Sequence, residues 1–154
     1  MGISNVKEMN TEYTKLYSKM QKLSSAKKIS IKVFDSDNNG KLSLAELKSA
    51  QQRIKNTVVN YMGDVEITDF DKNNRKIKQE YRLDDGTFVS QTVYKYNKQG
   101  QVSEAITFNA KKQVSCTTSY EYHSNGKVKT SVFKASDGIT MVEKYNPKGN
   151  YITE

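Results

Sequence analysis

A recurring turn signal constrains the fold of this chain more than any other feature of the sequence. In residues 64–154 an aromatic residue repeatedly begins a short polar segment, usually with Gly or Asn, and an apolar residue follows. The aromatic positions are Phe70, Tyr81, Tyr96, Phe108, Tyr122, Phe133 and Tyr145. Their spacing fits one strand plus one hairpin loop, and glycine supplies the positive φ that such loops need. The pattern predicts an antiparallel meander of about eight strands.

The residues before Gly63 follow a different period. Apolar side chains recur there at intervals of three and four, which is typical of amphipathic helices. Asn5 with Glu8 three residues later resembles a capping box at the first helix. We expect helices over the ranges 5–23, 26–34 and 44–60. The middle range is ambiguous, because its β-branched residues Ile29, Ile31 and Val33 also read as a strand.

These two periodicities divide the chain into a helical region, residues 1–62, and a sheet region, residues 63–154. The predicted fold class is α+β, with N-terminal helices packed on one face of a C-terminal antiparallel meander. The mean hydropathy of −0.80 and the 35% of hydrophobic residues are low for a chain that buries a core.

Composition narrows the possible chemistry. The 154 residues include one Cys and one His, which excludes an internal disulfide, a Cys-based zinc site and a His-rich metal site. His123 would have to serve any hydrolytic triad, and its neighbours do not support that role. No stretch approaches the roughly 18 apolar residues that a membrane span needs. We therefore expect a binding protein and not an enzyme.

The formal charge of +8 would suit an anionic partner, but it also fits a lysine-rich solvated surface. A nucleic-acid partner is disfavoured, because the chain has no arginine-rich block. Residues 1–10 lack the apolar centre of an export signal, so the chain is either cytoplasmic or lacks its signal.

Residues 35–46 carry the most specific motif. They match the pattern D-x-[DN]-x-[DN]-G-x5-E at every required position, with Gly40 at the glycine. Ca²⁺ takes six to eight oxygen ligands, and alternating acidic and amide side chains on a tight loop can supply them together. Lys41 would contribute its backbone carbonyl, and Ser43 its hydroxyl or a bound water. The predicted metal ligands are Asp35, Asp37, Asn39, Lys41, Ser43 and Glu46.

Residues 26–57 resemble the EF-hand family through this loop and its expected flanking helices. The resemblance implies calcium as the bound ion. Lys27 and Ser30 stand where the family usually has apolar residues, and the sequence offers no second loop to form a pair. The alternative interpretation is an Asx-rich turn that binds no ion. With one unpaired loop we expect a dissociation constant on the order of 10⁻⁵ to 10⁻³ M, which suits a structural site outside the cell.

Residues 64–154 resemble YD/Rhs-type or MORN-type repeats, through turns such as 96–102 and 122–128. The resemblance implies a non-catalytic β-scaffold, often found in bacterial surface proteins, toxin shells or immunity proteins. An aromatic-basic face on the sheet can bind a protein or a carbohydrate; alternatively, cross-strand aromatic pairs only stabilise the sheet. The residues of this face would be Tyr94, Tyr96, Tyr120 and Tyr122 with Lys95, Lys127 and Lys129.

Together these features predict a non-enzymatic calcium-binding protein of bacterial type, whose loop docks helices on a β-repeat interaction surface. The alternative is a toxin-neutralising or immunity-type protein that binds a protein partner through the sheet, with calcium only structural. A secreted or cell-surface location is favoured over the cytoplasm. The oligomeric state stays open.

Overall fold

The computed structural model describes the backbone of residues 3–153 and the side chains of residues 10–153. The predicted capping box at Asn5 and Glu8 therefore lies outside the described side chains. The helical elements are α1 (Ile3–Ala26), the 3₁₀ helix η1 (Ile31–Phe34), α2 (Leu44–Arg53) and the 3₁₀ helix η2 (Ile54–Asn56). No helix among the described residues has the length and apolar character needed to cross a membrane.

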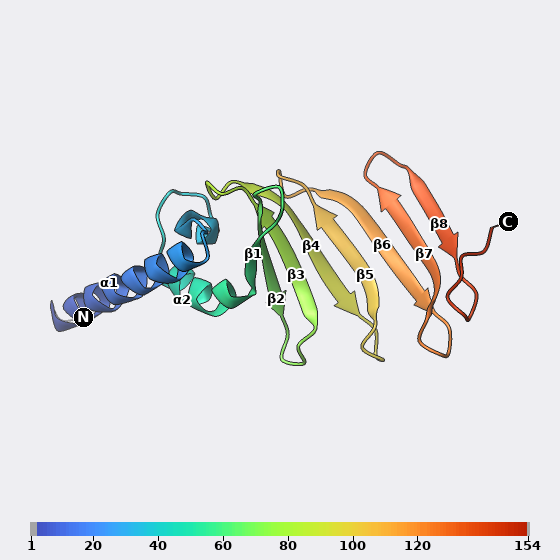
Figure 1. Ribbon diagram of the computed structural model, residues 1–154, viewed down its shortest axis with the longest axis horizontal. Helices are drawn as coiled ribbons and strands as arrows, with labels where there is room; N and C mark the ends of the chain where they lie inside the picture. The colour runs from blue at the N-terminus through green and yellow to red at the C-terminus, as the bar shows by residue number, and fades with distance from the viewer. Residues whose placement is uncertain (1–2, 154) are drawn as a thin grey trace. The chain divides into compact units, whose positions relative to one another are not determined.

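The strands form one eight-stranded antiparallel sheet in the order β1 to β8 (Figure 1). Sequential strands are neighbours throughout, so the predicted meander and the α+β class are confirmed. The strands are β1 (Thr57–Val59), β2 (Val65–Phe70), β3 (Lys76–Arg82), β4 (Phe88–Tyr96), β5 (Val102–Phe108), β6 (Val114–Tyr122), β7 (Val128–Ala135) and β8 (Thr140–Lys144).

The connections between strands all use the same turn. The N–H of its first residue donates to the carbonyl of its fifth, and the N–H of its fourth donates to the carbonyl of its first. The fourth residue has a positive φ, which closes a type I turn followed by a left-handed residue. Glycine holds this position in most turns, whereas Asn74 and Lys112 hold it in two. The turn chemistry read from the sequence thus produces the meander.

The predicted helix over residues 26–34 is wrong. The N–H of Ile29 donates to the carbonyl of Ser24, and that of Lys28 donates to Ser25, which closes α1 with a Schellman motif. Lys28 takes the left-handed conformation at φ 56°. Only the short 3₁₀ helix η1 follows, because the β-branched run has a low helix propensity.

The predicted helix over residues 44–60 is too long. A capping box of Ser43 and Glu46 begins α2, as the sequence predicts. The α-helix ends at Arg53 and continues as η2, after which Thr57 begins the first strand. Two β-branched valines, Val58 and Val59, favour the extended conformation there.

Contacts group the chain into two compact units. The first comprises residues 1–69 and 80–89, and the second comprises residues 70–79 and 90–154. The first unit contains an apolar core in which helices pack on β2, through Met20, Ile29, Val33, Phe34, Leu42, Leu47, Ala50, Ile54, Val65 and Ile67. In the described part of the second unit no apolar residue is buried.

Candidate metal centre

The segment 35–46 connects η1 to α2 in the first unit. Asp35 ends η1, and its backbone N–H donates to the carbonyl of Lys32. Asn38 and Gly40 both take left-handed conformations, at φ 56° and 82°. A Cβ at Gly40 would have open space around it, so glycine is needed there for its backbone conformation and not for room. These two residues bend the segment into a tight loop.

Three carboxylates converge in this loop. One oxygen from each of Asp35, Asp37 and Glu46 lies within 4.8 Å of the others. Asp35 is buried, with 6% of its surface exposed, and its two oxygens accept from the backbone N–H of Asn39 at 3.2 Å and of Gly40 at 2.8 Å. The loop backbone therefore holds the Asp35 carboxylate before any ion is bound.

Asn39 lies between the acidic residues. Its backbone N–H also donates to Asp37 at 3.1 Å, and its side-chain amide donates to the other Asp37 oxygen at 2.8 Å. Its own Oδ1 accepts from the N–H of Lys41 at 2.8 Å. Asp37 and Asn39 are exposed, so their oxygens can still exchange these contacts for a ligand.

Glu46 closes the loop from the first turn of α2. Its Oε1 accepts from the N–H and hydroxyl of Ser36 at 2.8 and 2.7 Å, and its Oε2 accepts from the N–H and hydroxyl of Ser43 at 2.8 and 2.9 Å. Burial by itself would raise the pKa of Glu46. The hydrogen bonds from Ser43 and Ser36 outweigh that effect and lower the pKa to about 2. The carboxylate is thus ionised at neutral pH.

The predicted ligands fit a hard divalent cation in their chemistry. Their donor atoms are oxygens, which Ca²⁺ and Mg²⁺ prefer, and a neutral imidazole or thiolate is absent from the described loop. Asp35, Asp37 and Glu46 come together as predicted, with Asn39 beside them. Ser43 uses its hydroxyl in the helix cap, where it donates to Glu46 and accepts from its N–H. Lys41 would act only through its carbonyl.

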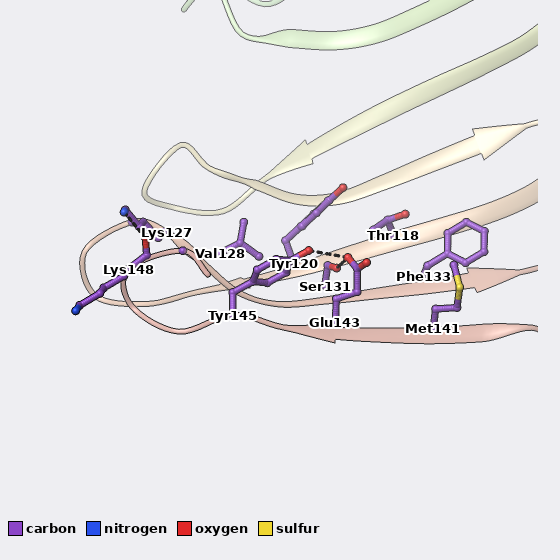
Figure 2. Close-up of a pocket in the computed structure, with 12 residues that line it drawn as sticks. Thr118, Tyr120, Lys127, Val128, Ser131, Phe133, Met141, Glu143, Tyr145 and Lys148 are labelled. Atoms are coloured by element: carbon purple, nitrogen blue, oxygen red, sulfur yellow. Dashed lines mark hydrogen bonds between the residues drawn. The ribbon is translucent and has the colours of Figure 1, made fainter. Parts of the chain in front are cut away.

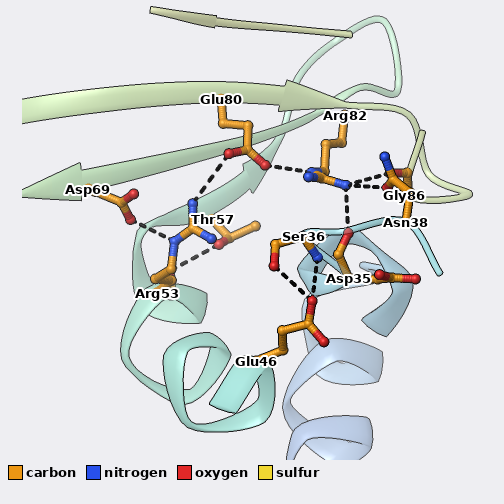
Figure 3. A network of polar contacts seen from close by, with 10 residues as sticks. All are labelled: Asp35, Ser36, Asn38, Glu46, Arg53, Thr57, Asp69, Glu80, Arg82 and Gly86. Atoms are coloured by element: carbon orange, nitrogen blue, oxygen red, sulfur yellow. Dashed lines mark hydrogen bonds and ion pairs between the residues drawn. The ribbon is translucent and has the colours of Figure 1, made fainter. Parts of the chain in front are cut away.

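Arg82 on β3 contacts the loop, and sequence analysis missed it. Its Nη1 donates to the backbone carbonyl of Asp35 and the Oδ1 of Asn38, both at 2.9 Å (Figure 3). The Arg82 side chain is only 3% exposed. Because 47 positions separate Arg82 from Asp35, no local pattern in the sequence could have indicated this contact.

Arg82 belongs to a chain of alternating charges, in which Arg82 and Glu80 are buried and Arg53 and Asp69 are half-buried. Its Nε donates to Glu80, and Nη2 of Arg53 lies 3.7 Å from the other Glu80 oxygen, within ion-pair range but too far for a hydrogen bond. Arg53 also donates to Asp69 at 2.7 Å. Two cations alternate with two anions (Figure 3), so the cluster adds no net charge beside the loop.

The second unit has a groove on β6, β7 and β8 with a volume of about 900 Å³. Tyr145 and Ser131 point at Glu143 and donate to its Oε2 at 2.8 and 3.0 Å (Figure 2). Figure 2 shows lysines at one end of the groove and apolar side chains at the other. The lining includes Tyr120, Lys127, Val128, Phe133, Met141 and Lys148.

Most tyrosines of the predicted aromatic-basic face contact neighbouring strands through their hydroxyls. Tyr120 and Lys127 share the groove. The hydroxyls of Tyr96 and Tyr122 donate to backbone carbonyls of adjacent strands, and that of Tyr94 donates to Gln79. These three tyrosines hold strands together, which agrees with the interpretation that cross-strand contacts stabilise the sheet.

No protein-family model matches this chain, and neither does any curated protein. Among solved structures, a mutant of S. aureus TarM in complex with fondaparinux, α-GlcNAc-glycerol and UDP is similar at 16% identity and a TM-score of 0.29. The GtfA/B complex bound to UDP and GlcNAc is similar at 11% identity and a TM-score of 0.24. The matches cover 78% and 61% of this chain but only 23% and 22% of those chains.

Proposed function

We propose that this protein is a non-enzymatic calcium-binding protein of EF-hand type. In this proposal Asp35, Asp37, Asn39 and Glu46 hold the ion with side-chain oxygens, Lys41 contributes its carbonyl, and Ser43 acts through its hydroxyl or a water. The convergence of three carboxylates within 4.8 Å is the observation that carries the proposal. Carboxylates this close repel one another unless a cation compensates them.

The ion would set the geometry of the helices, on which partner binding depends in this candidate. The loop lies between η1 and α2, and both elements contribute to the apolar core through Val33, Phe34 and Leu47. An ion bound by residues from both ends of the loop would fix the direction in which α2 leaves it. Calcium binding to the folded state then stabilises the first unit by mass action.

Calorimetric titration with CaCl₂ tests the proposal. Asp37→Asn removes one carboxylate charge, and the described hydrogen bonds of the Asp37 side chain come only from Asn39, so the variant should fold. We expect a wild-type dissociation constant on the order of 10⁻⁵ to 10⁻³ M, at least tenfold weaker binding for Asp37→Asn, and a higher melting temperature for the wild type in calcium.

Asp137→Asn is the matched control for this substitution. Asp137 is an exposed turn aspartate whose Oδ1 accepts from the N–H of Ile139, and an asparagine serves the same purpose at Asn125. The calcium affinity of the Asp137→Asn variant should equal that of the wild type. Equal affinities for Asp37→Asn and Asp137→Asn would show that any calcium binds elsewhere.

The interaction surface in this proposal is the groove on β6–β8. Its aromatic side chains and the Glu143 carboxylate, held by Ser131 and Tyr145, offer both apolar contact and a fixed hydrogen-bond acceptor to a protein or carbohydrate. Glu143→Gln with Tyr120→Ala should abolish partner binding while the calcium titration stays unchanged.

The second candidate is a toxin-neutralising or immunity-type protein, with calcium only structural. The exposed apolar side chains of β8 favour it, since Met141 is 55% and Val142 51% exposed. The two candidates differ in what chelation does. A partner captured by the sheet should dissociate in EGTA under the first candidate and stay bound under the second.

A further inference from the structure

We infer that Arg82 pre-organises the calcium-binding loop. The β3–β4 hairpin would then give this unpaired loop the rigidity that a second, paired loop would otherwise supply. The inference rests on the proposed function, because it concerns the same site. It assigns Arg82 as a positioning residue: it would touch the loop backbone and not the ion.

The contacts of Arg82 fix two points of the loop. One nitrogen, Nη1, donates to the carbonyl of Asp35 at 2.9 Å, to Asn38 Oδ1 at 2.9 Å and to the carbonyl of Gly86 at 2.8 Å. It thereby ties the loop to the hairpin turn. Asn38 has the left-handed φ of 56°, a conformation that a non-glycine residue adopts at a cost, and the Arg82 contact holds its side chain there.

Arg82 uses only neutral oxygens of the loop. It makes no described hydrogen bond to the carboxylates of Asp35, Asp37 or Glu46. These carboxylates accept instead from N–H groups and hydroxyls of the loop itself. The acidic oxygens therefore stay available for a cation. A salt bridge from Arg82 to one of them would instead have competed with the ion.

The charge of Arg82 is compensated on its other side. Its Nε donates to Glu80, and Glu80 in turn pairs with Arg53. A buried guanidinium without this partner would repel an incoming divalent cation and would be costly to bury. The pairing lets β3 place a hydrogen-bond donor against the loop without adding net positive charge.

The hairpin turn packs closely against η1. A Cβ on Gly86 would lie 2.6 Å from the carbonyl oxygen of Lys32, closer than real Cβ contacts allow. Gly86 also has a φ of 93°, which glycine adopts without strain. Two independent contacts, at Arg82 and at Gly86, therefore hold the hairpin against the segment 32–38.

Arg82→Lys tests the inference. Lysine keeps the positive charge, but its single nitrogen cannot contact Glu80 and the loop together, as Nε and Nη1 of the planar Arg82 guanidinium do. Freeing even one or two loop residues before binding should weaken calcium affinity by about tenfold, because their backbone order must then be gained on binding. Arg75→Lys is the matched control, since the described contacts of Arg75 are with Asp71 and the Tyr96 ring.

Asn38→Gly provides a second variant. Glycine keeps the left-handed conformation and removes one acceptor of Arg82. It should weaken calcium binding by about threefold alone and add less than that in the Arg82→Lys background, because both changes break one contact. Additive effects in this double-mutant cycle would overturn the inference.

Hydrogen exchange of the calcium-free protein separates positioning from general destabilisation. In Arg82→Lys the amides of Asn39 and Gly40 should exchange faster, while that of Leu47 in the core stays protected. If the wild type binds calcium and Arg82→Lys binds equally well, the inference is wrong and the proposed function stands. If the wild type binds no calcium, the proposed function fails first.

Discussion

The two units of this protein obtain their order in different ways. In the first unit, residues 1–69 and 80–89, helices and β2 enclose an apolar core in which Met20, Leu47 and Ile67 are fully buried. In the second, residues 70–79 and 90–154, the described strands bury no apolar side chain. The first unit depends on hydrophobic burial, whereas the second depends on backbone pairing and repeated turns.

Cross-strand contacts replace a core in the second unit. Tyr96 and Tyr122 each precede a turn and donate their hydroxyls to a carbonyl of the neighbouring strand. Thr92 and Thr107 share a hydrogen bond at 3.0 Å, and Lys95 pairs with Glu104. Each contact of this kind contributes about 0.2–1 kcal/mol, so stability is distributed over many positions. A single substitution should matter less here than in the first unit.

The largest predicted difference concerns truncation of apolar side chains. Leu47→Ala removes a fully buried side chain and should lower the free energy of unfolding by about 2–5 kcal/mol. Ile106→Ala, at a half-buried site on β5 opposite Val93 and Thr117, should cost at most about 1 kcal/mol. Urea denaturation followed by circular dichroism measures both. Similar costs would contradict the contrast between the units.

The next effect concerns two glycines with the same backbone conformation. Gly86 and Gly138 have φ values of 93° and 94°. Alanine at Gly138 meets open space and should cost only the left-handed conformation, about 1–2 kcal/mol. Alanine at Gly86 also collides with the Lys32 carbonyl and should cost about 1–3 kcal/mol more. Thermal denaturation of the two variants compares them, and equal losses would show that η1 does not press on the hairpin.

The turns between strands show what the sequence could predict. The turn residues act locally, so Asn97, Asn109 and Asn146 could be assigned from sequence, and their Oδ1 atoms accept from the N–H groups two and four residues later. Local chemistry likewise predicted the loop 35–46 and the capping box of α2. The first helix, predicted over 5–23, ends three residues before α1 does. The helix predicted over 26–34 is wrong, and Lys28, which takes the left-handed position there, offered no glycine signal.

Long-range contacts could not be predicted in the same way. In the sequence pattern Arg82 falls in the polar segment that begins at Tyr81, and its burial depends on how η1, the loop and the β3–β4 hairpin come together. Nor could the sequence indicate that the described strands of the second unit bury no apolar side chain. Its strands alternate apolar and polar residues as a half-buried sheet would, and that pattern led to the expectation that helices cover one face.

The smallest predicted effect is a pH dependence that differs between Glu46 and Glu143. The folded pKa of Glu46, about 2, lies below the ordinary value of 4.5, so ionised Glu46 stabilises the fold fully above pH 4.5. This contribution is lost as the pH falls through 4.5 toward 2. Hydrogen bonds from Tyr145 and Ser131 also lower the pKa of Glu143, but that carboxylate is exposed and screened by solvent.

Melting temperatures in calcium-free buffer between pH 6 and pH 2.5 measure this dependence. Glu46→Gln should flatten the acid side of the curve relative to the wild type, and Glu143→Gln should flatten it less. Parallel curves for the wild type and Glu46→Gln would show that the Ser36 and Ser43 hydrogen bonds do not hold the ionised carboxylate.

The position of a bound ion tests the central claim most directly. Crystals of the full chain grown in millimolar CaCl₂ can be measured at a long wavelength, where calcium scatters anomalously. The account predicts one anomalous peak in the loop, about 2.3–2.6 Å from oxygens of Asp35, Asp37 and Glu46. A loop without a peak, or a peak only at other residues, would contradict it.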